Sequence, residues 1–158
     1  MDGDEQRWLS PSPDLLRMRL FELAAVTAAV ALGAGLIGGL VWSAVVGIAA
    51  AVVAIALGLV AMPFVARRIR SWGYCEREDD LLVRHGLLVA RLSVVPYGRM
   101  QFIDVEAGPA ERLFKLSTLH LHTAAASTDA RIPGLGATEA ARLRDRLATL
   151  GEARAAGL

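Results

Sequence analysis

One apolar run dominates the pattern of hydrophobic and polar positions: no Asp, Glu, Lys or Arg occurs among the 44 residues from Leu23 to Ala66. A single helix of this length would extend about 66 Å at ~1.5 Å per residue, roughly twice the ~30 Å hydrocarbon core of a bilayer. The run therefore predicts two membrane-spanning helices, at Leu20–Gly38 and Ala44–Val65, joined by a tight turn that ends near Ser43. A cleaved signal peptide is the alternative, but it fits poorly because a second span follows directly.

Basic residues flank the predicted hairpin on one side of the membrane only, since the connecting turn carries no charge. Because positively charged flanks stay in the cytoplasm, this asymmetry predicts a multi-pass protein with both termini cytoplasmic. The flanking arginines anchor this topology or, alternatively, attract anionic lipid. The membrane-flanking candidates are Arg17, Arg19, Arg67, Arg68, Arg70 and the interfacial Trp72.

The composition of the spans argues against transport. Ion and proton pathways use ionisable residues within the membrane, and here only Glu22 stands at the very edge of the first span. Small residues recur instead at four-residue spacing, a pattern that lets helix backbones approach closely. They pack the two helices against each other or against the spans of a partner, and they are Ala31, Gly35 and Gly39, then Ala50, Ala54 and Gly58.

The predicted spans divide the chain into three regions: a flexible cytoplasmic tail at 1–19, the hairpin at 20–66, and a cytoplasmic domain at 67–158. From Ser71 onward the chain carries eleven basic and eleven acidic residues, so no electrostatic grip on nucleic acid is expected. Cys75 is the only cysteine, which excludes an intrachain disulfide, and we interpret it as a small buried hydrophobe.

The domain begins with a β pattern. Apolar strands are predicted at Leu81–Arg84 and Leu87–Val95, with turns at Asp79-Asp80 and His85-Gly86 and with Pro96 ending the second strand. Residues 101–106 and 119–123 alternate again. In the first of these segments Ile103 and Val105 are expected to face inward, and residues 109–116 are expected to form a short helical turn or loop.

The C-terminal segment changes to a helical period, with one apolar face formed by Ala140, Leu143, Leu147 and Leu150. Thr138 is the expected N-cap and Gly151 the expected stop. Antiparallel strands closed by one amphipathic helix indicate a small barrel or sandwich with the helix over an open end or edge.

Four motifs in order carry a family resemblance. They are Val95-Pro96-x-x-Arg99-x-Gln101, Val105-x-x-Gly108-Pro109-x-x-Arg112, Leu119-x-Leu121-x-Thr123-Ala124, and Ile132-Pro133-Gly134-Leu135. Together they resemble bacterial PH-like domains, in particular the short YdbS-like membrane proteins that pair two N-terminal spans with one such domain. Two departures occur: Lys115 stands where the family usually has glycine, and Ala124-Ala125-Ala126 replaces a Thr-Ala-Gly-Gly-like turn.

The resemblance implies a bacterial cell-membrane protein in which a two-helix transmembrane hairpin precedes an α+β domain. That domain is expected to be a PH-like split β-barrel, capped by its C-terminal helix and facing the cytoplasm. PH-like folds serve mostly as binding platforms, so the resemblance implies no activity. We interpret Arg99, Gln101 and Arg112 as residues that brace turns by hydrogen-bonding carbonyls.

Candidate chemistry is sparse. His120 and His122 share a strand face, as two metal ligands might, but no third ligand has matching spacing, so a solvated strand face is the better interpretation. Asp79-Asp80 suits a turn better than a cation site, and no phosphate loop, nucleophile elbow or paired catalytic carboxylates occur. An enzyme, a cofactor and a metal are therefore not expected. Phosphoinositide recognition is disfavoured because the domain has no lysine cluster.

Two functions follow as hypotheses. The first is a membrane-anchored, non-enzymatic module that binds another protein, such as a larger PH-like membrane protein or a second copy of itself. A barrel edge or the groove beside the C-terminal helix would accept a strand or peptide by main-chain pairing. The second is a lipid-surface or envelope-stress sensor that reads the cytoplasmic leaflet.

Overall fold

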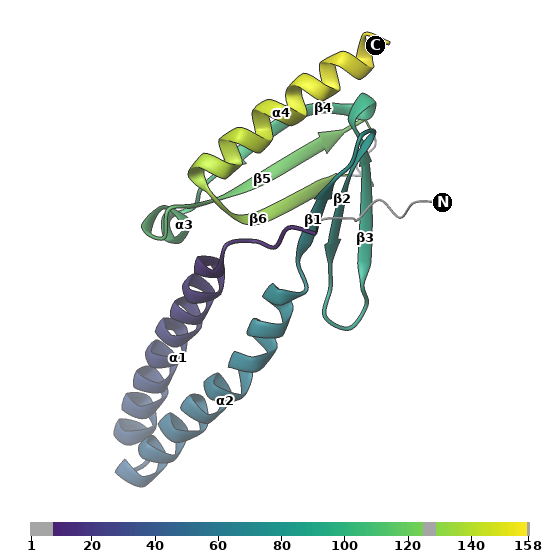
Figure 1. Ribbon diagram of the computed structural model, residues 1–158. Coiled ribbons are helices and arrows are strands. Elements are labelled where there is room, and N and C mark those ends of the chain that lie inside the picture. Colours follow the sequence, from purple (N-terminus) through teal and green to yellow (C-terminus); the bar gives the residue numbers. More distant parts are fainter. Residues whose placement is uncertain (1–7, 125–128, 158) are drawn as a thin grey trace. The chain divides into compact units, whose positions relative to one another are not determined.

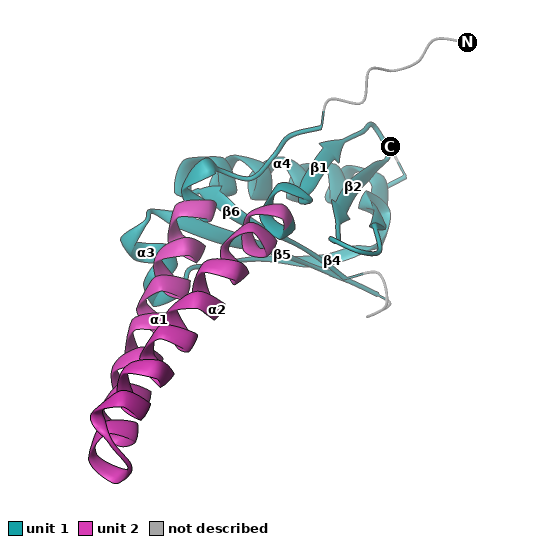
Figure 2. Cartoon of the chain, turned by 90° about the horizontal axis from the view of Figure 1, so that it is seen from below, with its two compact units in different colours: residues 1–15, 68–158 teal, residues 16–67 magenta. Residues whose placement is uncertain are grey.

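The computed structural model describes residues 8–124 and 129–157. The expected flexible tail at 1–7 and two of the departing alanines, Ala125 and Ala126, lie outside these residues. The chain forms two compact units: a hairpin from Leu16 to Arg67, and a domain that combines the segment ending at Leu15 with the chain from Arg68 onward (Figure 2).

The hairpin consists of α1 (Pro13–Val41) and α2 (Ala44–Arg70), both long and apolar enough to cross a membrane. The two helices approach most closely at glycines. A Cβ added to Gly47 would lie 2.7 Å from the amide nitrogen of Gly39, and one added to Gly58 would lie 2.5 Å from Thr27 Oγ1. The small residues therefore pack the hairpin helices against each other. On α2 the close approaches at glycines involve Gly47, Ala51 and Gly58, and the expected Ala50 and Ala54 are half-buried.

Helix α1 begins well before the predicted start at Leu20. Ser12 Oγ accepts a hydrogen bond from the Asp14 amide at 3.3 Å, and Pro13 occupies the first helical position. A serine N-cap followed by proline at the first position is a favourable helix start. The expectation of a flexible tail through residue 19 is therefore wrong for the described part of that segment.

The domain contains six strands in two antiparallel three-stranded sheets, ordered β1-β2-β3 and β4-β5-β6 (Figure 1). The elements are β1 (Gly73–Glu76), β2 (Asp80–His85), β3 (Arg91–Pro96), the 3₁₀ turn η1 (Tyr97–Arg99), β4 (Met100–Glu106), α3 (Pro109–Leu113), β5 (Leu116–Thr123), β6 (Ala130–Gly136) and α4 (Ala137–Ala155).

A single apolar core lies between the two sheets and α4, which runs across the sheet formed by β4, β5 and β6 (Figure 1). Its fully buried members include Leu81 and Val95 from the first sheet, Leu119 from the second, and Leu143 and Leu147 from α4. The helix covers the sheet as predicted, and the arrangement is that of a PH-like domain. The two sheets stay separate, however, and do not close into a barrel.

Several boundaries differ from the predictions. The strand expected from Leu87 begins only at Arg91, because Gly86 turns the chain with φ +125° and the following loop leaves Leu88 96% exposed. Val105 was expected to face inward but is exposed, whereas Ile103 packs on the core. Strand β6 was not predicted, since proline and glycine disfavour strands; as the edge of its sheet it tolerates Pro133.

The C-terminal helix also has different ends. Gly136, not Thr138, occupies the N-cap position, and the helix continues past Gly151 to Ala155. A Cβ at Gly151 would lie 3.5 Å from the Tyr97 carbonyl oxygen. This glycine therefore permits close packing of α4 on η1 and does not end the helix.

The segment before α1 is part of the domain. Leu9 and Tyr74 exchange two backbone hydrogen bonds of 2.8 and 2.9 Å, so the segment lies along the outer edge of β1. The Arg84 guanidinium lies 4.7 Å from the centre of the Trp8 ring. Because a covered sheet edge cannot pair with another chain, this edge of the first sheet is closed.

Candidate functional site

Three of the family-motif residues, Gly108, Pro109 and Arg112, stabilise the turn around α3. Pro109 is the first residue of α3, and the Gly108 amide donates a 2.7 Å hydrogen bond to Glu111 Oε2. Thr118 Oγ1 donates to the other oxygen of that carboxylate at 2.7 Å, and Arg112 Nε donates to the Ala107 carbonyl at 3.0 Å. These bonds hold the connection between β4 and β5 in one conformation.

The remaining motif residues also have backbone roles. Pro96 ends β3, and the Arg99 carbonyl accepts a 3.2 Å hydrogen bond from the Ala124 amide. The buried Thr123 donates its amide to Asp129 Oδ1 at 2.8 Å. Gln101 lies between Met100 and Phe102, where the register of the β4–β5 pairing shifts. Within residues 8–124 and 129–157, the Arg99 and Gln101 side chains make no hydrogen bond to a carbonyl.

Lys115 is the one non-glycine residue with positive φ, +54°, among the described residues. A left-handed backbone favours glycine, which explains why glycine is usual at this position in the family that the sequence resembles.

The membrane-flanking candidates lie on different elements. Arg17 and Arg19 are inside α1, where Arg19 pairs with Glu22 at 2.7 Å. Arg67, Arg68 and Arg70 belong to the last turn of α2. Trp72 has left the helix and lines a groove of the domain.

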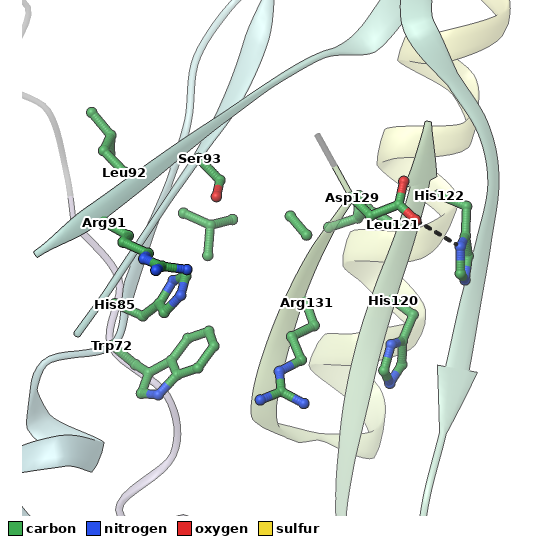
Figure 3. A pocket seen from close by; sticks show the side chains of 12 residues that line it. Trp72, His85, Arg91, Leu92, Ser93, His120, Leu121, His122, Asp129 and Arg131 are labelled. Atoms are coloured by element: carbon green, nitrogen blue, oxygen red, sulfur yellow. Dashed lines mark ion pairs between the residues drawn. The ribbon is translucent and has the colours of Figure 1, made fainter. Parts of the chain in front are cut away.

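This groove, which we call the inter-sheet groove, has a volume of about 590 Å³ and lies between the two sheets of the domain (Figure 3). Its walls come from the first sheet on one side and from β5 and β6 on the other. The polar and aromatic side chains that line it are Trp72, His85, Arg91, Ser93, His120, His122, Asp129 and Arg131.

His85 lies at one end of this groove. Its ring stacks on Trp72 with a centroid distance of 4.6 Å, and the Arg131 guanidinium lies 5.9 Å from the centre of the Trp72 ring. Burial lowers the pKa of His85, and the positive charges of Arg91, Arg131 and Arg68 lower it further. The imidazole at this end is therefore mainly neutral at pH 7, in the positive field of these arginines.

The other end of the groove holds His120 and His122, which share one strand face as the sequence predicts. Both are partly exposed: His120 Nε2 lies 3.6 Å from Glu106 Oε2, and His122 Nδ1 lies 3.4 Å from Asp129 Oδ2. The hydrogen bond from the Thr123 amide is the main cause that lowers the pKa of Asp129. No group of three or more metal-ligating side chains occurs in the described parts of the chain.

A second groove of about 320 Å³ runs between α4 and β4, and we call it the α4–β4 groove. Its floor is largely apolar, and its wall includes Phe102, whose side chain is 53% exposed. Strand β4 is an edge of its sheet, so its outer backbone groups have no neighbouring strand. The residues that line it are Met100, Gln101, Phe102, Ile103, Leu147, Ala148, Gly151 and Ala155, together with the charged Arg144 and Glu152.

Sequence reasoning singled out Trp72, His85, His120 and His122 but did not bring them together. Arg91 and Arg131 were missed, because on alternating strands an isolated arginine resembles any solvent-facing residue. The order of charged residues along the sequence does not indicate that Arg91 and Arg131 line the same groove.

Comparison with known proteins gives the family. Residues 18–150 match the family model described as "Bacterial PH domain". The chain is 33% identical over 96 residues to the UPF0699 transmembrane protein YdbS of Bacillus subtilis, covering 60% of this chain and 59% of that protein. It is 29% identical over 97 residues to the UPF0699 transmembrane protein YdbT of the same organism, covering 58% of this chain and 20% of that protein.

The matched regions thus include less than two thirds of either curated relative. No solved structure matches the chain. The match from α1 to α4, together with the two sheets and the covering helix, shows that this chain is a membrane protein of the bacterial PH domain family.

Proposed function

We propose that this protein is a membrane-anchored, non-enzymatic interaction module whose domain faces the cytoplasm and binds another protein through the α4–β4 groove. The observation that carries the proposal is an apolar groove along an unpaired edge strand. A partner segment in extended conformation would pair with the backbone of β4 and place side chains against Phe102 and Met100. In the other sheet, the edge at β1 is already covered by Leu9.

The partner we favour is a PH-like membrane protein, either a second copy or a longer relative. Bacillus subtilis contains both YdbS and YdbT, and YdbT is the longer of the two, as the 97 matched residues make up 20% of its length. Two proteins of one family confined to one membrane meet at high local concentration, because each is held in the same plane.

Photo-crosslinking of the full-length protein in its native membrane tests this function. A photoreactive amino acid at Phe102 or Ala148 should give a crosslinked protein of defined mass, and the same group at the exposed Leu113 should not. The mass of the product distinguishes a second copy from a longer partner. Equal crosslinking from all three positions, or crosslinks from Leu113 alone, would show that the α4–β4 groove is not the binding site.

A lipid-surface sensor is the second candidate, and it is favoured by the position of three arginines in the last turn of α2. Cations beside a span attract anionic lipid by ~1 kcal/mol each. Under this function, anionic lipid in the vesicle should change the conformation of the reconstituted full-length protein, for example its protease cleavage pattern. A cleavage pattern that is the same in neutral and anionic vesicles would exclude it.

A further inference from the structure

The arginines around His85 have no acidic partners. Arg91 on β3, Arg131 on β6 and Arg68 at the end of α2 make no ion pair within residues 8–124 and 129–157. The arginines of α4 differ: Arg142 Nη2 lies 3.1 Å from Glu76 Oε1, and Arg146 Nε lies 3.0 Å from Glu76 Oε2. From Ser71 onward the basic and acidic residues balance, so the positive charge of Arg91 and Arg131 in the inter-sheet groove is a local excess.

The one carboxylate that lines this groove does not offset that excess. Asp129 accepts hydrogen bonds from the Thr123 amide and lies 3.4 Å from His122 Nδ1, at the far end from His85. Figure 3 shows the side chains of Arg91 and His85 next to each other above Trp72, and Arg131 on the facing wall.

The His85 ring also has an unsatisfied polar atom. Its Nδ1 is enclosed and has no hydrogen-bond partner among the described residues. Buried polar atoms are nearly always hydrogen-bonded, so an orphan atom of this kind indicates a group that the protein atoms do not supply. Arg91 and Arg131 both line this groove and both act on His85 electrostatically, so the missing group is expected to be an anion, which a guanidinium binds by charge-assisted hydrogen bonds.

We propose that the His85 end of the inter-sheet groove binds a phosphate group, with Arg91 and Arg131 as its ligands and the Trp72–His85 stack as the wall. Guanidinium groups present planar pairs of N–H donors that match phosphate oxygens. A neutral His85 ring donates one further hydrogen bond from Nδ1 or, once the anion is bound, becomes protonated. The site takes one phosphate group, so it does not require the lysine cluster expected for a polyphosphorylated headgroup.

Two kinds of ligand carry such a phosphate group: the headgroup of an anionic phospholipid and a soluble phosphate ester. Trp72 follows the last residue of α2 by two positions, so the site begins next to the end of a membrane-spanning segment. This proposal is independent of the α4–β4 groove, which shares no lining residue with the inter-sheet groove.

The test uses full-length protein in a neutral detergent and two probes, phosphatidylglycerol and glycerol phosphate. Native mass spectrometry should show one saturable molecule per chain. The Arg91→Gln/Arg131→Gln variant should weaken binding at least about tenfold, because two charge-assisted contacts are lost. The control variant Arg99→Gln/Arg144→Gln removes the same charge outside the inter-sheet groove and should bind like the wild type. Binding of phosphatidylglycerol alone assigns the lipid source, and equal binding of glycerol phosphate assigns the soluble source.

A second measurement needs no variant. Bound phosphate should raise the pKa of His85 in the wild-type protein, as followed by NMR of the imidazole, because the anion opposes the field of the arginines. No binding of either probe, equal weakening in both double variants, or an unchanged His85 titration at saturating probe would each overturn the proposal. A Phe102→Ser variant, which targets the α4–β4 groove, should leave phosphate binding unchanged and so separates the two sites.

Discussion

Gly134 and Leu15 are in contact at a point where only glycine fits. Gly134 has φ +70°, and a Cβ at this position would lie 2.6 Å from Leu15 Cδ2 and 2.7 Å from Leu15 Cβ. Leu15 is 2% exposed, and the Ser12 amide donates a 2.8 Å hydrogen bond to the Gly134 carbonyl. The first residues of α1 are thereby attached to β6, more than 100 positions later in the chain.

Gly134→Ala should therefore destabilise the domain by about 2–4 kcal/mol, through the left-handed backbone and the clash with Leu15. Gly98→Ala is the matched control, because its Cβ would meet only Arg154 Cβ at an ordinary 3.7 Å. The measurement is thermal unfolding of the full-length protein in mild detergent. Similar melting temperatures for both variants would mean that the contact between Leu15 and Gly134 contributes nothing to stability.

Leu147→Ala should cost about 2–5 kcal/mol, because Leu147 is fully buried in the core between α4 and the sheets. Thr149→Ala, on the exposed side of α4, should change the free energy of unfolding by less than about 0.5 kcal/mol. Arg146 is unsuitable as the neutral control, since it pairs with the mostly buried Glu76. Chemical unfolding of the full-length variants measures both effects, and equal losses would show that α4 is not packed as described.

Alkaline pH should unfold the domain through its two tyrosines. Burial is the main cause that raises the pKa of both Tyr74 and Tyr97 to about 12. An unfolded tyrosine ionises near pH ~10, so their stabilising contribution is complete below pH ~10 and is lost as the pH rises toward about 12. Melting temperatures between pH 9 and 12 should fall over this range, and less steeply for Tyr97→Phe.

These are the only tyrosines of the chain, so the absorbance of tyrosinate follows them directly. Ionisation of both at the pH of an unfolded tyrosine, without any loss of structure, would contradict this prediction.

The topology can be tested at the turn between α1 and α2. A cysteine introduced by Ser43→Cys should react with an impermeant thiol reagent added outside the cell, whereas the buried Cys75 should not. A reporter that is active only in the cytoplasm should be active when fused after Leu158. Labelling of a cysteine placed at the C-terminus by the external reagent would reverse the proposed orientation.

The sequence by itself determined the transmembrane hairpin and the covering helix. A run of 44 uncharged residues predicts membrane-spanning helices, because a helix on the surface of a water-soluble protein needs a polar face. Leu143 and Leu147 likewise recur with the helical period, so the buried face of α4 followed from spacing alone. The motifs around Gly108, Thr123 and Gly134 indicated the family, and the family match confirms it.

The tertiary structure alone decided where distant residues meet. A strand pattern shows which side chains share a face, but not which strands face each other across a gap. Arg91 and Arg131 line one groove with His85 because the two sheets face each other there, and Leu15 reaches Gly134 because the segment before α1 lies on the domain. Such contacts depend on long-range packing, which local hydrophobic periodicity does not encode.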